Sequence, residues 1–198
     1  MNENYEHPGI PEGAEADIIK GMYAFRQGGE DKQAPRVQLL GSGTIFNEVI
    51  AAAALLKSDW GVEADLWSCP SFTELARNGQ AVARHNMLHP EVPALEAHVT
   101  KLLKNAKGPV IASTDYVRAF AEQIRAFVPN RYVVLGTDGF GRSDTRENLR
   151  HFFEVDRRWV TVAALNALAD EGVVPKSTVA AAIAKYQLDP SKPNPMTV

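Results

Sequence analysis

The sequence predicts an α/β protein with three layers, in which helices cover both faces of a mainly parallel β-sheet. Short apolar or alternating runs, typical of strands, occur at residues 36–40, 62–67, 109–113 and 132–135. Longer runs with apolar residues three and four positions apart, typical of helices, occur at residues 44–57, 71–87, 95–103, 116–128, 156–170 and 177–186. Strands that alternate with helices in this way indicate crossover connections, which join parallel strands.

A weaker signal precedes this alternation. Residues 16–25 alternate imperfectly, with Ile19, Met22 and Phe25 among the apolar positions, and we expect a further strand there. The glycine pair within residues 27–32 indicates a turn that separates this segment from the next strand.

The composition is that of a globular domain. The chain has 198 residues, of which 45% are hydrophobic and 23% are charged. Its net charge of −3 gives no basic surface for nucleic acid, and its apolar runs are too short to cross a membrane. Cys69 is the single cysteine, so an intrachain disulfide and a cysteine metal cluster are excluded. Without a signal-peptide pattern at residues 1–13, we expect a cytoplasmic protein.

The first candidate motif is Gly41-Ser42-Gly43, which lies between a predicted strand and a predicted helix. Backbone N–H groups at such a helix start can bind a phosphate, as in dinucleotide-binding proteins. The full dinucleotide pattern requires a third glycine, and Phe46 occupies that position. This favours a tight turn in which Ser42 or Thr44 caps the helix.

The second candidate is a glycine-rich loop that follows the strand predicted at residues 132–135. It therefore lies at the carboxyl edge of the sheet, where open α/β folds place their sites. We expect Asp144 to cap a helix there, with Glu147 reaching back as in a capping box. Two interpretations stay open, an anion-binding or interface loop and a turn closed by its own ion pairs. The candidate interface residues are Asp138, Gly139, Phe140, Gly141, Arg142, Asp144 and Arg146.

Catalytic, cofactor-binding and metal-binding residues are not expected in this chain. His85 and His89 are four residues apart, but the following Pro90 disfavours a continuous helix and no carboxylate completes a zinc pattern. Cys69 has no evident base and is interpreted as a small buried apolar residue. His151 is expected to pack or to form a structural hydrogen bond.

The two other histidines, His7 and His98, are interpreted as ordinary loop and helix positions.

Several long motifs carry a resemblance to a known family. They are MNENYEHPGIPEG, LLGSGTIFNEVIAAAALL, SFTELARNGQAVARHNMLHP, ASTDYVRAFAEQIRAFVPNRYVVLGTDGFGRSDTRENLRHFFEVD and AAIAKYQLDPSKPNP. Together they cover essentially the whole chain. The chain resembles the C-terminal region of the homodimeric pyruvate dehydrogenase decarboxylating components of bacteria, which are transketolase-like thiamine enzymes.

This resemblance implies a particular fold and domain organisation. It implies a mostly parallel five-stranded sheet with one antiparallel strand, supplied by residues 16–25 in a hairpin with residues 36–40. Residues 1–15 would be a linker from a preceding pyrimidine-binding domain, and residues 16–198 would form a transketolase-like C-terminal domain.

The resemblance also implies a function for the full-length enzyme. Such enzymes decarboxylate pyruvate on thiamine diphosphate with magnesium and reductively acetylate the lipoyl group of a dihydrolipoyl acetyltransferase. Their cofactor ligands lie in the preceding domains, so this domain would be a structural and assembly part, inactive alone, that contacts those domains and the second subunit of a homodimer.

Three alternatives remain at this point. They are a docking module for the acetyltransferase component or a protein regulator, the C-terminal domain of a transketolase, and a free-standing nucleotide-binding α/β protein.

Overall fold

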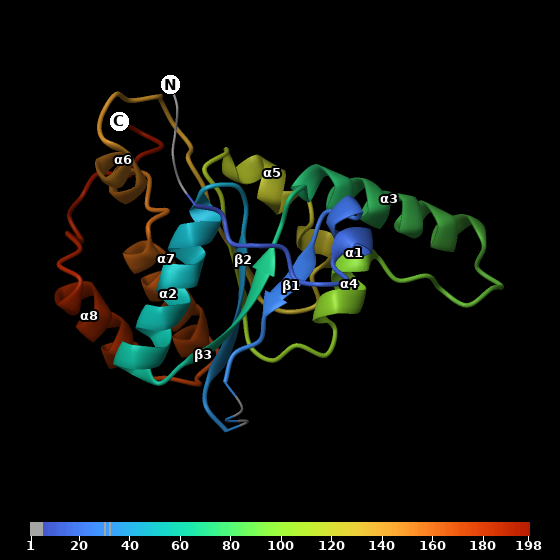
Figure 1. The fold of residues 1–198 in the computed structure, drawn as a ribbon, viewed down its shortest axis with the longest axis horizontal. Coiled ribbons are helices and arrows are strands. Elements are labelled where there is room, and N and C mark those ends of the chain that lie inside the picture. Colours follow the sequence, from blue (N-terminus) through green and yellow to red (C-terminus); the bar gives the residue numbers. More distant parts are fainter. Residues whose placement is uncertain (1–5, 30, 32) are drawn as a thin grey trace.

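A five-stranded mixed β-sheet forms the centre of the protein (Figure 1). The structure, a computed structural model, describes residues 6–29, 31 and 33–198. The strand order is β1-β3-β2-β4-β5; β2, β3, β4 and β5 are parallel, and β1 is antiparallel to β3. The strands are β1 (Tyr23–Arg26), β2 (Arg36–Gly41), β3 (Glu63–Ser68), β4 (Val110–Ser113) and β5 (Tyr132–Leu135).

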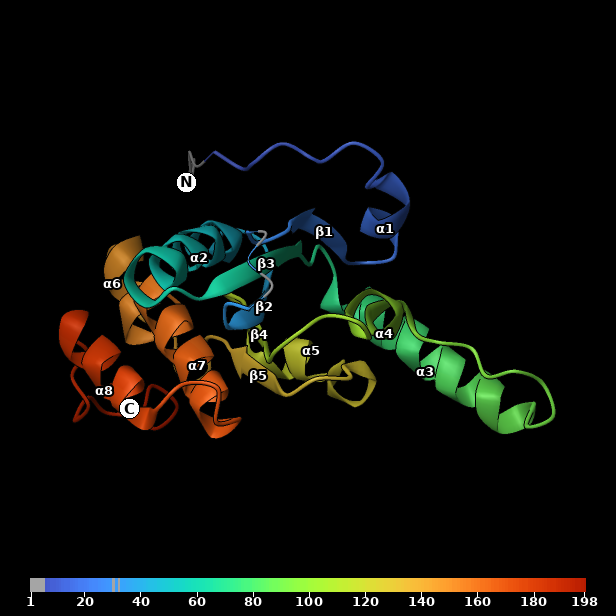
Figure 2. The same cartoon turned by 90° about the horizontal axis from the view of Figure 1, so that it is seen from below.

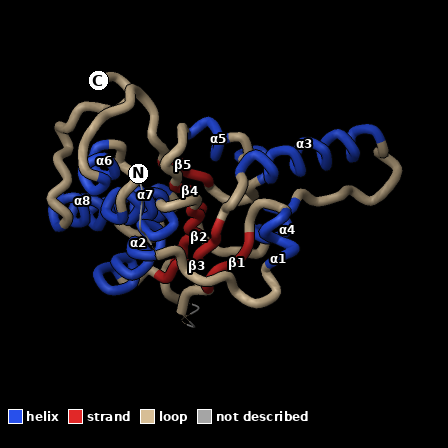
Figure 3. The backbone as a smooth tube through the Cα atoms, turned by 45° about the horizontal axis from the view of Figure 1, so that its top comes forward, coloured by secondary structure: helices blue, strands red, loops and turns tan. Residues whose placement is uncertain are grey.

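Helices cover both faces of this sheet, which confirms the predicted three-layer α/β class (Figures 2 and 3). One face carries α2, α7 and α8, and the opposite face carries α3, α4 and α5. The helices are α1 (Glu15–Ile19), α2 (Ile45–Trp60), α3 (Phe72–Leu88), α4 (His98–Leu103), α5 (Arg118–Glu122), α6 (Arg146–Phe152), α7 (Arg157–Asp170) and α8 (Lys176–Lys185). A 3₁₀ turn follows at Arg125–Phe127.

The central strands β2 and β4 carry apolar residues on both faces because both of their faces are buried. Leu39 and Ile111 pack in the core beneath α2 and α7, whereas the next residues along each strand, Leu40 and Ala112, pack in the core beneath α3 and α4. All four side chains are inaccessible to solvent. Successive residues of a strand face opposite layers, so a sheet between two helical layers needs continuous apolar runs.

The strand predicted at residues 16–25 is only partly correct. Residues 15–19 form the short helix α1, and only Tyr23–Arg26 are extended. The predicted pairing is also wrong, because β1 pairs with β3, with Tyr23 opposite Ser68, rather than with β2. The reason is that β2 already pairs with β3 on one side and with β4 on the other. Residues 1–5 of the predicted linker, and Glu30 and Lys32 of the predicted turn, lie outside the described residues.

Two helices are shorter than predicted. The segment 95–103 becomes helical only at His98, because Leu95 is held in the preceding loop by two hydrogen bonds with the Asn86 side chain. In the segment 116–128, α5 ends at Glu122 and only a 3₁₀ turn follows. Val128 is extended, as expected for the residue before Pro129, so the segment is not helical as far as residue 128.

Helix α3 extends well past the edge of the sheet (Figure 2). Its first half packs through Phe72, Leu75 and Ala76, while its last turns carry the exposed Met87 and Leu88. Within the described part of the chain, none of the helices combines the length and apolar character needed to cross a membrane.

The approach of β4 to β2 depends on Gly108. Gly108 has a φ of +80°, and a methyl group added there would overlap the backbone carbonyl of Arg36 at the start of β2. Beside it, the Gln38 N–H donates to the Pro109 carbonyl at 2.9 Å. A side chain at position 108 would therefore separate two central strands.

We expect Gly108→Ala to destabilise the domain more than Gly172→Ala. Both glycines have positive φ, but Gly172 has no atom within 4 Å of the added methyl group. The backbone conformation costs each variant about 1–3 kcal/mol, whereas only Gly108→Ala adds an overpacking cost of about 1–3 kcal/mol. Urea unfolding of both variants measures the difference, and equal losses would contradict the close approach.

Candidate functional site

The carboxyl ends of the four parallel strands lie along one edge of the sheet, at the top of Figure 1. The connection after β2 leads into α2 on one face, while the connection after β4 leads into α5 on the other face. Neighbouring strands whose connections diverge in this way form a topological switch point, where open α/β sheets place ligand or contact sites.

Short polar side chains join the loops at this switch point. The Ser42 hydroxyl donates to Thr114 Oγ1 at 2.8 Å, and Thr44 Oγ1 donates to Asp115 Oδ2 at 3.2 Å. The Thr137 hydroxyl donates to the Asp115 carbonyl at 2.6 Å. The expectation that Ser42 or Thr44 caps α2 is correct for the position of Thr44, which is the N-cap residue. It is wrong for the hydrogen bond, since both hydroxyls bind neighbouring loops and Thr44 makes no cap hydrogen bond.

A cleft of about 640 Å³ opens beside these loops. Its wall comprises Thr44, Asp115, Thr137, Phe140, Arg142 and Phe153, together with neighbouring residues. It mixes apolar rings with side chains of both signs of charge.

The first half of the candidate interface loop is fixed by contacts from outside the loop. Asp138 Oδ1 accepts from the Arg118 N–H at 3.0 Å, and Asp138 Oδ2 lies 3.1 Å from Arg118 Nε. Gly139 has a φ of +98° and lies against the Pro195 carbonyl of the C-terminal segment, where a side chain would not fit. Phe140 follows with 77% of its surface exposed.

The second half of the loop leads into α6. The Arg142 guanidinium lies over the Phe152 ring, 4.4 Å from its centre. Asp144 Oδ1 accepts from the Asn148 side-chain amide and from the Thr145 N–H, and these hydrogen bonds hold the pKa of Asp144 below its ordinary value. Gly141 and Arg146 also line the cleft. These contacts differ from the self-contained ion-pair turn that was one interpretation of the sequence.

The start of α6 lies where it was predicted, but its cap residue differs from the predicted one. Thr145, rather than Asp144, is the cap residue of α6, and its hydroxyl accepts from the Asn148 N–H at 3.3 Å. Glu147 does not reach back to the cap, because its exposed side chain points toward Arg158, 3.9 Å away. Asp144 cannot act as the cap while its carboxylate binds Thr145 N–H one residue ahead.

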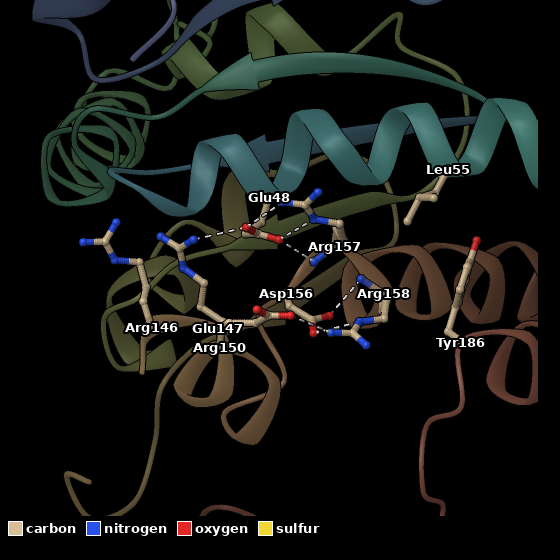
Figure 4. A pocket seen from close by; sticks show the side chains of 9 residues that line it. All are labelled: Glu48, Leu55, Arg146, Glu147, Arg150, Asp156, Arg157, Arg158 and Tyr186. Atoms are coloured by element: carbon tan, nitrogen blue, oxygen red, sulfur yellow. Dashed lines mark hydrogen bonds and ion pairs between the residues drawn. The ribbon is translucent and has the colours of Figure 1, made fainter. Parts of the chain in front are cut away.

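Beneath the loop lies a buried carboxylate, Glu48 on α2 (Figure 4). Glu48 Oε1 accepts from Arg150 Nη1 and from Arg157 Nη2, each at 3.1 Å. Its Oε2 accepts from Arg157 Nε at 2.9 Å and from the Arg157 backbone N–H at 3.0 Å. Only 6% of the Glu48 surface is exposed. Through its two arginine partners, this one carboxylate joins α2 to α6 and α7.

A second carboxylate, Asp156, organises the start of α7 beside this cluster (Figure 4). Asp156 Oδ1 accepts from the backbone N–H groups of Arg158 and Trp159, which caps the helix. Its Oδ2 lies 3.2 Å from His151 Nδ1, so the structural hydrogen bond expected for His151 is confirmed.

The electrostatics of Glu48 are set by two opposing effects. Burial on its own would raise the pKa of Glu48, but the hydrogen bonds from Arg157 and the charges of Arg157 and Arg150 outweigh burial and lower it. The carboxylate therefore stays charged and fully hydrogen-bonded inside the protein. Such a cluster fixes the relative positions of the three helices.

Glu48 is not among the candidate residues predicted from the sequence, although the sequence contains a signal for it. Glu48 is three residues after Ile45 and four before Ala52, so it interrupts the apolar face of its helix. A carboxylate in that position must find buried partners. The partners Arg150 and Arg157 are about a hundred residues away in the chain, at separations of 102 and 109, and local patterns do not reveal them.

The other candidate residues have structural surroundings. Cys69 is fully buried, and burial raises the pKa of its thiol, as expected for a small apolar residue. The rings of His85 and His89 lie 4.5 Å apart on the exposed end of α3. His98 is not an ordinary helix position, because it is buried and its Nε2 lies 3.0 Å from the Met22 carbonyl.

The fold defines a class of protein. It is a three-layer α/β domain with a mainly parallel sheet that has one antiparallel strand at its edge. More particularly, the chain belongs to the family of transketolase-like TK C-terminal domains, whose profile matches residues 21–156. This confirms the family to which the long sequence motifs pointed.

Known relatives agree with this assignment. The chain is 75% identical over all 198 residues to the pyruvate dehydrogenase E1 component of Cupriavidus necator, and 58% identical over 199 aligned positions, 99% of the chain, to that of Pseudomonas aeruginosa. It spans 22% of the length of each of these relatives.

A solved structure shares the fold. Transketolase from Pichia stipitis, in complex with sedoheptulose-7-phosphate, superposes with a TM-score of 0.52 at 16% identity, over 79% of this chain and 19% of that one.

Thiamine diphosphate with magnesium, the cofactor that the family implies, does not fit the residues described here. Magnesium in such sites is held by carboxylates together with the cofactor's phosphates. At the carboxyl edge, Asp138 is bound by Arg118 and Asp115 accepts from Thr44. Among residues 6–29, 31 and 33–198, no group of three or more histidine, cysteine or acidic side chains is arranged to hold a metal ion.

We expect Glu48→Gln to lower the stability of the domain and to change its pH dependence. Removing one partner of a buried ion pair costs about 3–5 kcal/mol, and glutamine leaves the two arginines without their counter-charge. Because the folded-state pKa of Glu48 is lowered, its stabilising contribution is present above the ordinary glutamate pKa and is lost as the pH falls through the lower folded value.

Urea unfolding from pH 7 down to pH 3 measures both effects. The wild-type chain should lose more stability on acidification than Glu48→Gln does. Glu147→Gln is the matched control, because the Glu147 side chain is exposed and should have little effect. Parallel pH profiles for wild type and Glu48→Gln would contradict the role of this carboxylate.

Proposed function

We propose that this chain is the C-terminal domain of a pyruvate dehydrogenase E1 component. The observation that carries the proposal is the 75% identity with such a component, which extends over all 198 residues without a gap in coverage. Residues 16–198 form the domain, and residues 1–15 are the linker from a preceding pyrimidine-binding domain. The names of the relatives favour this assignment over the C-terminal domain of a transketolase.

In this proposal the domain contributes assembly rather than chemistry. The full-length enzyme decarboxylates pyruvate with thiamine diphosphate and magnesium held by its preceding domains. It then reductively acetylates the lipoyl group of a dihydrolipoyl acetyltransferase. It works as a cytoplasmic homodimer. Support comes from Glu48 and Asp156, two buried acidic side chains that join and cap helices, and from the cleft of mixed character at the carboxyl edge.

The candidate interface loop has a specific role in this proposal. Asp138, Gly139 and the C-terminal segment hold Phe140 outward at the carboxyl edge, where it contacts another part of the enzyme. Arg142, Asp144 and Arg146 form the polar border of that contact.

A second candidate function is a docking module for the acetyltransferase component or for a protein regulator. It is favoured by the far end of α3, which projects from the sheet (Figure 2). This end of α3 and the loop that follows it carry four exposed apolar side chains. These are Met87, Leu88, Val92 and Leu95. A pull-down of the isolated domain with the acetyltransferase tests this candidate, and loss of retention in Met87→Ser would assign the contact to α3.

We expect the 198-residue chain to bind thiamine diphosphate and magnesium far more weakly than the full-length enzyme does. Isothermal titration of both proteins with the cofactor measures this, and a pyruvate decarboxylation assay is run on the same samples. The full-length enzyme is the positive control. Tight, saturable binding by the 198-residue chain would overturn the assignment of the cofactor to the preceding domains.

A further inference from the structure

Five large apolar side chains are exposed along the carboxyl edge of the sheet, and we refer to them as the aromatic edge. They are Tyr116, Val117, Phe120, Phe140 and Met196. They come from three separate parts of the chain: the start of α5, the loop after β5, and the C-terminal segment. Clusters of exposed aromatic and large apolar residues are typical of contact surfaces, since single exposed residues need no such explanation.

Ring and backbone contacts join the three parts into one surface. The Tyr116 and Phe120 rings meet edge to face, with their centres 5.3 Å apart. The Tyr116 carbonyl accepts from the Thr137 N–H at 2.9 Å, which links the segment before α5 to the loop after β5. Gly139 in turn packs against the backbone of Pro195 and Met196.

The aromatic edge is also held in place before any partner arrives. The ion pair between Arg118 and Asp138 fixes the loop to the start of α5. The Thr137 hydroxyl binds the Asp115 carbonyl at 2.6 Å. A surface that is already ordered loses little conformational entropy on binding, so its apolar area contributes more fully to the contact.

The course of the N-terminal segment indicates what covers this surface. The Glu6 carbonyl accepts from Asn47 Nδ2 at 3.0 Å, and the His7 ring stacks on the Phe46 ring with centres 6.0 Å apart. Phe46 and Asn47 lie in the first turn of α2, directly after the carboxyl end of β2. The N-terminal segment therefore reaches the domain at the carboxyl edge of the sheet, where the aromatic edge also lies.

We propose that the aromatic edge is the docking surface for the domain that precedes this one in the full-length enzyme. The proposal rests on the proposed function, in which the chain is the last part of a longer polypeptide. The relatives are more than four times as long as this chain, because it spans 22% of their length. The proposed linker is held at this edge through Glu6 and His7, so the domain that precedes it has a raised effective concentration there.

Two methionines provide an internal test. Met196 belongs to the aromatic edge and is 51% exposed, whereas Met87, at the far end of α3, is 71% exposed. Met22 is fully buried and serves as the protected reference. Oxidation by hydrogen peroxide, followed by peptide mass spectrometry, is run on the 198-residue chain and on the full-length enzyme.

We expect Met196 to oxidise roughly tenfold more slowly in the full-length enzyme than in the 198-residue chain, because oxidation follows exposure. Met87 should oxidise at similar rates in both proteins. Equal rates for Met196 in the two proteins, or protection of Met87 alone, would overturn the proposal. Each measurement is repeated after tenfold dilution, and protection of Met196 that disappears on dilution would assign the surface to a second copy instead.

A matched pair of variants tests the same surface without relying on the C-terminal segment. Phe140 and Ile19 are almost equally exposed, at 77% and 78%, but Ile19 lies on α1, outside the aromatic edge. Phe140→Ser should raise Met196 oxidation several-fold in the full-length enzyme, whereas Ile19→Ser should not.

Neither variant should change the unfolding of the 198-residue chain, which serves as the folding control. No change in Met196 oxidation in Phe140→Ser would count against the proposal. Pyruvate decarboxylation is assayed separately, so a full-length protein without that activity would refute the proposed function while the oxidation pattern still decides the docking surface.

Discussion

The Glu48 carboxylate lies where helices α2, α6 and α7 meet, and it receives hydrogen bonds from Arg150 and Arg157. These arginines belong to the part of the chain that follows the last strand. Their attachment to α2 therefore fixes the C-terminal helices on the sheet. Because α6 begins directly after the glycine-rich loop, the same carboxylate anchors one end of that loop. The ion pair between Arg118 and Asp138 anchors the other end.

This arrangement explains how the domain presents a defined surface at the carboxyl edge of the sheet. The polar groups of the switch point bind one another across loops, as Ser42 binds Thr114 and Thr44 binds Asp115. Their hydrogen-bonding capacity is used to hold the edge of the sheet together. The exposed apolar side chains of Tyr116, Phe120 and Phe140 lie at that edge beside the polar residues of the loop that leads into α6, and apolar groups favour association.

The fold class could be predicted from the sequence because its physical cause is local. Leu39 and Leu40 are adjacent apolar residues that face opposite helical layers, and such runs already indicate a sheet covered on both faces. The pairing of residues 16–25 could not be predicted, since it depends on which strand edge remains free after β2 has bound two neighbours.

The position of the candidate site could be predicted from the sequence, but the partners of its charged residues could not. The loop around Phe140 could be placed at the carboxyl edge because it directly follows a strand. The partner of Asp138 could not, because Arg118 comes from a different connection. Glu48 could be recognised as an anomaly on an apolar helix face, but its arginine partners become neighbours only when the C-terminal helices fold back onto α2.

The complete burial of Cys69 has a consequence for how the domain can be studied. Its thiol is inaccessible and its pKa is raised, so in the folded state it is neither exposed to reagents nor ionised near neutral pH. It lies in the core beneath α3 and α4, on the face opposite Glu48. A thiol reagent can reach it only when that layer separates from the sheet, so the rate of labelling reports how often the layer opens. The labelling rate of the single cysteine thus measures how often the helical layer of α3 and α4 opens locally.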